Sequence, residues 1–184
     1  MLADSTASTR PAGADTAALV AAARDGDRAA FGTLYERYAR FVHGVLLAHA
    51  DRGDVPDLVQ DVFFRAMRQL HGLRDPAAFA PWLATLARNE ARMRHRATRP
   101  TEALTEALPS TAHAADSANL TMDEVLAALH TLPERYREPL TLRLVQQLHG
   151  EEIAARLGLS HGTVRVYLHH GLRLLREALG ARHD

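Results

Sequence analysis

The segment from Glu151 to Arg165 limits the possible folds of this chain more than any other segment. Its residues suit two short helices that cross closely, because Ala154 is small and Gly158 accepts the positive φ of a tight turn. Ser160 can then cap the second helix with its hydroxyl oxygen. This order of residues predicts a helix-turn-helix, a motif that often places its second helix in the major groove of DNA.

The second helix of this motif has an inward and an outward face. A plain helical hairpin would also use Gly158 and Ser160, but it does not require the complete arrangement. The apolar residues expected to plug the motif are Leu159, Val164 and Leu168. The residues expected to face a major groove are His161, Thr163, Arg165, Val166, His169 and His170.

Composition favours helices throughout the chain. Hydrophobic residues make up 47% of the 184 residues but aromatic residues only 5%. Ala and Leu dominate, and they form helices with small cores more readily than twisted sheets. A chain of this length can hold two compact halves of about 70 to 80 residues each. We therefore expect an all-α protein with two small helical domains.

The chain contains no cysteine, which excludes a disulfide framework, a Cys-based zinc site and a Cys nucleophile. The apolar stretch 41–50 is interrupted by two His residues and is far too short to span a bilayer. The first residues of the chain contain no apolar core of a signal peptide. We expect a cytoplasmic protein that does not insert into a membrane.

Charge is balanced overall but unevenly distributed along the chain. The 22 basic residues are all Arg, and 22 acidic residues offset them, which argues against a uniformly basic surface for nucleic acid. Residues 62–100 hold eight Arg and two acids, whereas residues 101–124 hold five acids and no Arg. A cationic segment is therefore followed directly by an acidic one.

Periodicity divides the chain into four parts. Residues 1–14 are small and polar without a repeating pattern, and we expect them to be disordered. Helical spacing of apolar residues over 15–96 and again over 122–180 predicts the two domains. Residues 97–121 are rich in Ala, Thr, Ser and Pro, which is typical of a flexible linker.

Within the first domain, Pro56 and Asp57 are typical of a helix start and predict a helix over 56–70. Phe64 falls on the face opposite the apolar stripe, where Asp61, Arg65 and Arg68 also lie. Either a neighbouring helix covers Phe64 or this side chain belongs to a surface that binds a partner protein. The stripe itself consists of Val59, Val62, Phe63, Ala66 and Leu70.

The next predicted helix begins with Asp75 as N-cap and Pro76 in its first turn. Five Arg residues follow between Arg88 and Arg99 at its far end. A solvated charged face is one explanation for them. Nucleic-acid binding is the other, because Phe79 and Trp82 lie upstream, where aromatic rings could stack on bases beside phosphate contacts. Trp82 taken alone is more typical of a core.

The second domain is expected to begin with a capping box formed by Thr121, or its neighbour, and Glu124. Helical spacing then continues beyond Leu132–Pro133 as far as Leu148. Pro139 should kink this helix or mark a restart, since proline cannot donate a helical hydrogen bond.

Eleven His residues raise the possibility of a metal site, but no pair has the HxxxH or HExxH spacing of metal ligands. The chain also lacks a P-loop, a GxGxxG motif and a GxSxG motif. We therefore expect no metal, no cofactor and no catalytic residue. A metal-dependent enzyme is the function class that the sequence favours least.

Four motifs in order resemble the extracytoplasmic-function sigma factors, the minimal two-domain sigma factors of bacterial RNA polymerase. The resemblance extends from Asp15 to Leu179. Residues 53–63 resemble the helix with which the family binds core polymerase. The family's promoter-melting helix is resembled by Phe79, Trp82–Leu83 and Ala87–Asn89. Leu132–Arg135 and Gly162–Arg165 resemble its second conserved domain.

The resemblance implies three binding surfaces. Core polymerase would contact Asp57, Leu58, Gln60, Asp61, Phe64 and Arg65. The minus-ten element would contact Arg74, Phe79, Trp82, Arg88, Asn89, Arg92 and Arg96, and the loop 71–78 would capture a flipped base. The minus-thirty-five element would contact Ser160, His161, Thr163, Arg165, His169 and Arg173. The linker would follow the RNA exit path.

The chain departs from the family pattern at three places. Val166–Tyr167 stands where a small polar and a basic residue are common, and His170–Gly171 replaces a basic and a small residue. Met93 stands where an Asp is common. These changes imply fewer phosphate contacts and altered contacts to the minus-ten element.

The sequence thus predicts a sigma factor that binds core RNA polymerase and promoter DNA and is controlled by an anti-sigma factor. The reduced basicity after Arg165 motivates an alternative. In that alternative the chain is a sigma-like adaptor, which binds an anti-sigma protein without initiating transcription.

Overall fold

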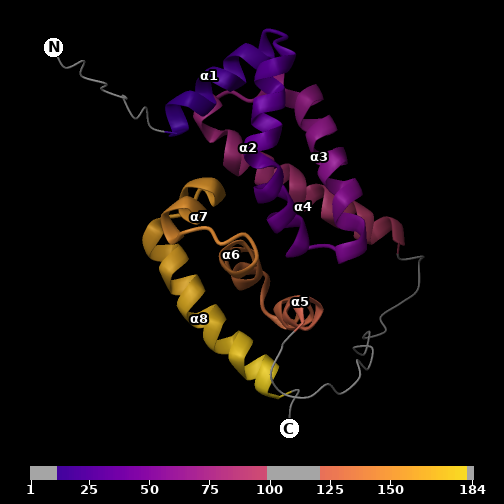
Figure 1. Cartoon of the computed structure of the whole chain (residues 1–184), viewed down its shortest axis with the longest axis vertical. Helices are drawn as coiled ribbons and strands as arrows, with labels where there is room; N and C mark the ends of the chain where they lie inside the picture. The colour runs from indigo at the N-terminus through magenta and orange to yellow at the C-terminus, as the bar shows by residue number, and fades with distance from the viewer. Residues whose placement is uncertain (1–11, 99–120, 182–184) are drawn as a thin grey trace, which may run out of the picture.

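The computed structural model describes residues 12–98 and 121–181, and it consists of helices joined by short connections (Figure 1). No strand occurs in these two ranges, which confirms the expected all-α class. The helices are α1 (Ala12–Arg24), α2 (Arg28–Leu47), α3 (Val55–Gln69), α4 (Phe79–Thr98), α5 (Met122–Thr131), α6 (Glu134–Leu144), α7 (Gly150–Leu157) and α8 (His161–Gly180). Short 3-10 helices occur at η1 (Arg52–Asp54), η2 (Leu70–Gly72) and η3 (Pro76–Ala78).

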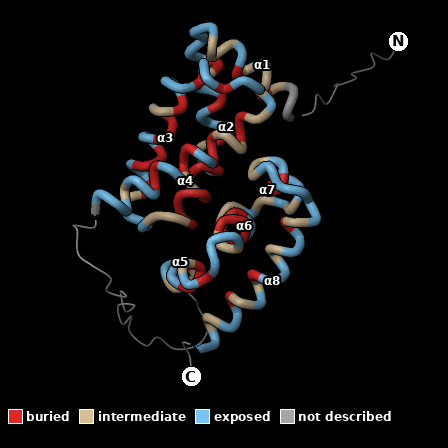
Figure 2. Tube along the Cα trace, turned by 180° about the vertical axis from the view of Figure 1, so that it is seen from behind, coloured by how far each residue is buried: buried red, intermediate tan, exposed pale blue. Residues whose placement is uncertain are grey.

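Helices α1 to α4 form the first domain, with α2 at its centre. Helix α2 packs against α1, α3 and α4, and α3 packs along α4. Phe41, Phe79 and Leu83 are fully buried between these helices. The rings of Tyr38 and Phe79 meet edge to face with centroids 5.2 Å apart, which joins α2 to α4. Figure 2 shows the buried residues gathered where the helices face one another.

Helix α3 confirms the helix predicted over 56–70, since it runs from Val55 to Gln69. Every residue of the predicted stripe is buried, because positions three and four apart share one face of a helix. Phe64, on the other face, is 58% exposed. Of the two explanations for this residue, coverage by a neighbouring helix is therefore wrong for the described part of the chain.

Two carboxylates in the first domain cap the N-terminal ends of helices. Asp27 accepts hydrogen bonds from the N–H groups of Ala29 and Ala30, at 2.8 and 3.1 Å, and so begins α2. Asp75 accepts a hydrogen bond from the N–H of Ala77 at 2.9 Å, which confirms its predicted role. It caps η3, which leads directly into α4.

Helices α5 to α8 form the second domain. The predicted capping box is confirmed, because the Thr121 hydroxyl accepts from the Glu124 N–H and the Glu124 carboxylate accepts from the Thr121 N–H. Helix α8 packs against α5, α6 and α7. Leu129, Leu140, Ile153 and Val164 are buried where these helices meet.

The helix expected up to Leu148 is wrong in its end, and a restart at Pro139 is also wrong. Pro139 lies inside α6 without a restart, and α6 ends at Leu144. The chain then turns through Gln147, whose φ of +58° is incompatible with a continuing helix. His149 precedes α7 as its N-cap, and its N–H donates to the Glu152 carboxylate at 2.8 Å.

The two domains pack against each other. Helix α2 contacts α6, and α4 contacts α7, so segments far apart in sequence lie side by side (Figure 1). Helix α4 continues to Thr98, two residues into the predicted linker. The rest of that linker up to residue 120, and residues 1–11 of the predicted disordered lead, lie outside the described residues. The domain limits themselves stay predictions.

Gly158→Ala should destabilise the protein, because Gly158 has a φ of +69° and L-residues adopt this region at a cost of about 1–2 kcal/mol. The free energy of unfolding in urea should fall by about that amount. Gly162→Ala is the control, since the nearest heavy atom to its added Cβ would be 3.8 Å away. An equal loss in both variants would contradict the role of Gly158 in the turn.

Candidate nucleic-acid and polymerase interfaces

Helices α7 and α8 have the geometry of a helix-turn-helix. Gly158 ends α7 in the left-handed conformation, and Ser160 begins α8 by accepting a hydrogen bond from the Thr163 N–H at 3.0 Å. Ala154 and Val164 are buried at the crossing, as predicted. The expected plug Leu159 is wrong, because it is 37% exposed at the turn and lies outside the crossing. The buried contact within the motif is therefore made by residues of the two helices and not by the turn residue Leu159.

The outward face of α8 carries most of the residues predicted to contact the minus-thirty-five element. Thr163 is half-buried, and its hydroxyl lies 2.8 Å from that of Ser160. Arg173 donates to Glu177 at 2.6 Å, one turn further along the helix. The exposed members of the predicted set are Ser160, His161, Arg165, His169 and Arg173. The face is accessible to a large partner, and cationic in part.

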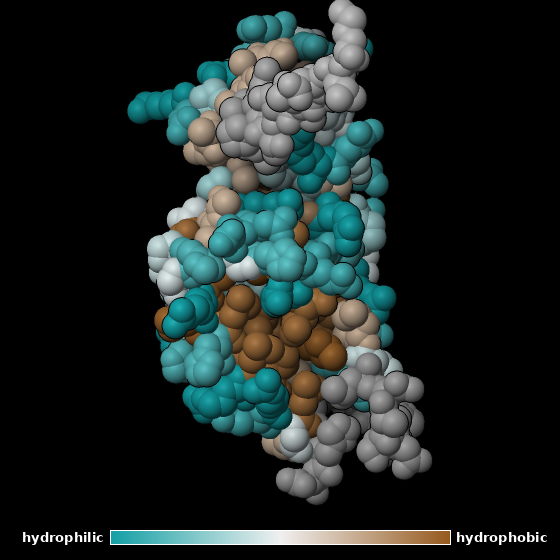
Figure 3. Space-filling model, turned by 60° about the vertical axis from the view of Figure 1, so that its left-hand side comes forward, coloured by the Kyte–Doolittle hydropathy of each residue, from teal (hydrophilic) through white to brown (hydrophobic). Residues whose placement is uncertain are grey.

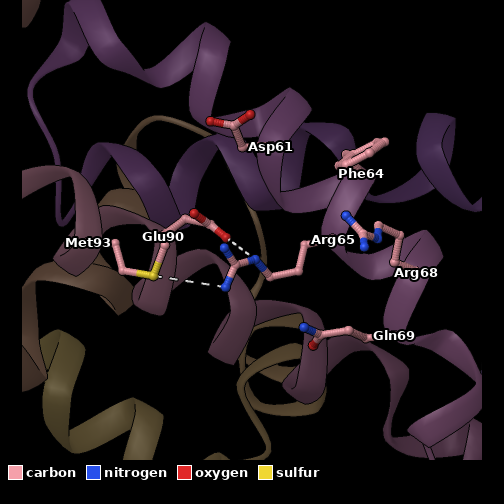
Figure 4. Close-up of a pocket in the computed structure, with 7 residues that line it drawn as sticks. All are labelled: Asp61, Phe64, Arg65, Arg68, Gln69, Glu90 and Met93. Atoms are coloured by element: carbon pink, nitrogen blue, oxygen red, sulfur yellow. Dashed lines mark hydrogen bonds and ion pairs between the residues drawn. The ribbon is translucent and has the colours of Figure 1, made fainter.

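The outward face of α3 surrounds a shallow hollow. Phe64 stands beside it, and the guanidinium of Arg68 lies 5.6 Å from the centre of the Phe64 ring. Arg65 reaches across the hollow to an ion pair with the buried Glu90 of α4 (Figure 4). The residues that line the hollow are Asp61, Phe64, Arg65, Arg68, Gln69, Glu90 and Met93.

The side chains predicted to contact core polymerase do not all share this face. Asp57, Gln60 and Asp61 are exposed beside Phe64. Leu58 is wrong as a contact residue, because it is 1% exposed and belongs to the core of the first domain. It lies one residue from Asp57, and that step of about 100° around a helix moves it onto the buried side.

The residues predicted for the minus-ten element are also divided. Phe79 is wrong as a DNA contact, because it is fully buried between Tyr38 and the half-buried Trp82. Its burial makes it an anchor for α4 and leaves Trp82 closer to the surface. The exposed polar members of the set are Arg74, Asn89, Arg92 and Arg96.

Arg88 is held by the second domain. Its Nε and Nη2 atoms donate to the two carboxylate oxygens of Glu138 on α6, at 2.9 and 2.7 Å. His49, two residues beyond the end of α2, lies 2.9 Å from the same carboxylate. Sequence reasoning missed Glu138, because its two partners are 50 and 89 residues away in the chain and no local pattern connects them.

The surroundings of this buried cluster shift two pKa values. Burial by itself would raise the pKa of Glu138, but the hydrogen bonds from His49 and Arg88 outweigh it and hold the pKa below its usual range. The hydrogen bond to Glu138 raises the pKa of Arg88. The cluster is therefore fully ionised at Glu138 near neutral pH.

No group of three or more His, Cys, Asp or Glu side chains within residues 12–98 and 121–181 is placed to hold a metal ion. None of the helices in these ranges is both long and apolar enough to cross a bilayer.

Comparison with known families defines the class of this protein. The family model described as Sigma-70 region 2 matches residues 34–101, and the model described as Sigma-70, region 4 matches residues 122–175. The two matches fall on the two helical domains in the order predicted. The chain is therefore a two-domain sigma factor of the sigma-70 type.

Curated relatives narrow this class. RNA polymerase sigma factor CarQ of Myxococcus xanthus is 35% identical over 162 residues, which cover 85% of this chain and 93% of the relative. The ECF RNA polymerase sigma-E factor of Escherichia coli strain K12 is 33% identical over 162 residues, covering 80% and 85%. The chain belongs to the extracytoplasmic-function sigma factors, which confirms the resemblance found in the sequence.

Solved structures with the same fold include two protein complexes. CnrH in complex with the cytosolic domain of CnrY gives a TM-score of 0.63 at 27% identity, and covers 91% of this chain and 98% of CnrH. The sigma factor RpoE in complex with the anti-sigma factor NepR from Bartonella quintana gives 0.54 at 22% identity, with coverage of 82% and 96%. The second comparison supports the fold alone.

The depressed pKa of Glu138 predicts how acid acts on the cluster. A carboxyl whose pKa is lower in the folded than in the unfolded chain stabilises the fold above its ordinary value of 4.5 and loses this effect as the pH falls through the lowered value. Glu138→Gln should therefore unfold about 1–3 kcal/mol more easily than the unchanged protein at pH 7. The difference should shrink steadily below pH 4.5, as urea unfolding at several pH values would measure. A difference independent of pH would contradict the ionised pair.

Proposed function

We propose that this chain directs core RNA polymerase to a set of promoters and helps to open their DNA. The observation that carries this function is the arrangement of two matched domains, each with its own exposed binding face. In this role the chain binds and positions, and the polymerase carries out the chemistry. The protein would act in the cytoplasm, where its polymerase and DNA are found.

The outward face of α3 is the proposed contact with core polymerase. Aromatic side chains are enriched among the residues that dominate the binding energy of protein interfaces. Phe64 is such a side chain, and Asp61 and Gln60 surround it with polar groups. Arg65 is fixed by its ion pair with Glu90, so this part of the face is ordered before a partner arrives.

The far end of α4 is the proposed contact with the minus-ten element. Asn89 and Arg96 are exposed there, and Arg74 is exposed in the preceding loop. These side chains suit phosphate and base contacts to a separated strand, while Trp82 offers a partly exposed ring for stacking. Capture of a flipped base would couple recognition of the element to its melting.

The outward face of α8 is the proposed reader of the minus-thirty-five element. A recognition helix contacts base edges with residues near its N-terminus, where His161, Thr163 and Arg165 lie. Arg165 is the cation nearest this end of α8, and a guanidinium can bond a guanine with two donors.

An anti-sigma factor is the proposed regulator. The second domain exposes four large apolar side chains, and Figure 3 shows an apolar area framed by hydrophilic residues in the lower half of the molecule, where this domain lies. Such areas commonly bind other proteins. The four side chains are Met122, Leu144, Leu159 and Val166.

The alternative function is an adaptor that binds an anti-sigma protein without initiating transcription. The specific observation in its favour is Val166, which is 51% exposed on α8 where the family commonly has a polar residue. An apolar side chain there suits a protein partner better than a phosphate.

Reconstituted transcription separates the two functions. Core polymerase from the organism that encodes the chain would be mixed with the purified protein and fragments of its genome, and the starts of the transcripts would be mapped. Transcripts that share upstream elements support the proposed function. Binding to neither core polymerase nor DNA would refute it, whereas binding to an anti-sigma protein alone would support the adaptor.

Arg165→Ala should weaken promoter binding by about 1–3 kcal/mol if the guanidinium contacts a base. Arg176→Ala is the matched control, because Arg176 is also exposed on α8 but lies about three turns away. Footprinting and fluorescence anisotropy on a mapped promoter would measure both variants. An unchanged footprint with Arg165→Ala would place recognition on α4 instead.

Phe64→Ala should weaken binding to core polymerase by about 2 kcal/mol or more, which is the size expected of an aromatic side chain at the centre of an interface. Binding of the labelled protein to core polymerase would be titrated without DNA. Met122→Ala removes a comparably exposed apolar side chain from α5 and should leave this affinity unchanged. Equal affinities for both variants would show that core polymerase binds elsewhere.

A further inference from the structure

Val166 is the most exposed large apolar side chain among the described residues of the second domain, with an exposed fraction of 51%. Each residue turns a helix by about 100°, so Val166 lies about 140–180° around α8 from the buried residues Val164, Gly171 and Leu175. The side chain therefore stands at the middle of the outward face of α8.

We infer that Val166 reads the methyl group of one thymine in the minus-thirty-five element and thereby helps to set which promoters the protein selects. The inference rests on the proposed function of α8 and adds to it the identity of a base. Val166 stands where the family commonly has a polar residue, so this contact belongs to the chain's own sequence.

The chemistry of valine limits what this side chain can read. Valine has no hydrogen-bond donor or acceptor, so Val166 can bond neither a phosphate nor the polar edge of a base. Thymine presents a methyl group in the major groove, beside which an apolar side chain can pack and exclude water. A polar base edge at the same place would lose its water without gaining a hydrogen bond. Val166 therefore favours thymine by attraction and disfavours other bases by desolvation.

The charge around Val166 favours DNA as the partner of this face. Residues 153–176 contain four Arg and three His but no acidic residue. His169 and His170 lie beside Val166 on the exposed side of α8, because positions three and four apart are neighbours on a helix. Duplex DNA carries one negative charge per about 1.7 Å of its axis. Phosphates thus complement the rim of the face, while the apolar centre meets the bases.

The rotation of α8 about its axis is fixed by contacts on its inner side. A Cβ on Gly171 would lie 2.8 Å from Cδ1 of Leu140 and 3.2 Å from Cβ of Tyr136, so α8 approaches α6 closely there. The rings of Tyr136 and Tyr167 meet edge to face with centroids 5.7 Å apart. Val166 is therefore held outward before DNA arrives, along the outer edge of the second domain (Figure 1).

Arg165 indicates where the thymine should lie. The Cα atoms of consecutive residues are about 3.8 Å apart, and consecutive bases of one DNA strand are about 3.4 Å apart along the axis. Neighbouring residues of a recognition helix therefore reach the same or nearby base pairs. We expect the thymine within about two base pairs of the base that Arg165 contacts.

Uracil in place of thymine tests the contact, because the two bases differ only in the 5-methyl group. The chain would be assembled with core polymerase, and duplex fragments of a mapped promoter would carry uracil at one thymine of the minus-thirty-five element at a time. At one position the dissociation constant should rise about fourfold, which corresponds to about 0.8 kcal/mol for one buried CH₂ group. Fluorescence anisotropy would measure the constants.

Val166→Ser and Val166→Thr form a matched pair, since both introduce a hydroxyl and only the threonine keeps a methyl group. Val166→Ser should bind the thymine and uracil duplexes equally well. Val166→Thr should keep the preference for thymine, because a threonine methyl can also pack on the thymine methyl. Unfolding curves would establish that both variants are folded.

A minus-thirty-five element without thymine would overturn the inference. An undiminished preference for thymine in Val166→Ser would also overturn it and would leave Val166 to the protein partner of the alternative function. Loss of the preference in both variants would assign the effect to the added hydroxyl, which contradicts a methyl contact. A failure of the proposed function gives a different result, because the chain would then direct core polymerase to no fragment, with thymine or with uracil.

Discussion

The carboxylate of Glu138 lies almost fully buried between the two domains, where it accepts from Arg88 and meets His49. Removing a carboxylate from water costs several kcal/mol unless hydrogen bonds and an opposite charge compensate it. Two groups of the first domain provide that compensation for a group of the second. The relative position of the domains is therefore specific, because a small displacement would leave a buried charge without its partners.

Helix α2 serves both domains through different parts of its surface. Leu34, Phe41 and Val45 fill the core of the first domain. Gly44 presents bare backbone to α6, and His49, just beyond the helix, reaches Glu138. A mutation on this helix can thus alter the contact between the domains while the core of the first domain stays intact.

The proposed binding faces differ in how far they take part in the contact between the two domains. Phe64 on α3 lies beside a hollow formed wholly by the first domain, so core polymerase could reach it while the two domains are in contact. Arg88 instead lies at the contact between the domains, where its guanidinium donates to Glu138 and its side chain is 27% exposed.

Several features could be predicted from the sequence because they depend on neighbours within one or two helical turns. The stripe on α3, the cap at Asp75, the capping box at Thr121 and the turn at Gly158 are of this kind. The predictions from the sequence were wrong where a residue type suits two different positions in a structure. Phe79 fits an aromatic base platform as well as a core, and Pro139 fits a helix start as well as a helix interior.

The sequence by itself determined the helices, their order in two domains and the family, since these follow from periodicity, caps and motifs that are local in the chain. Only the tertiary structure decided which of these side chains are accessible. It buried Leu58 and Phe79, exposed Phe64, and brought Glu138 to a cation 50 residues away. Accessibility depends on which surfaces meet, and the contact between α2 and α6 leaves no periodic signal in either helix.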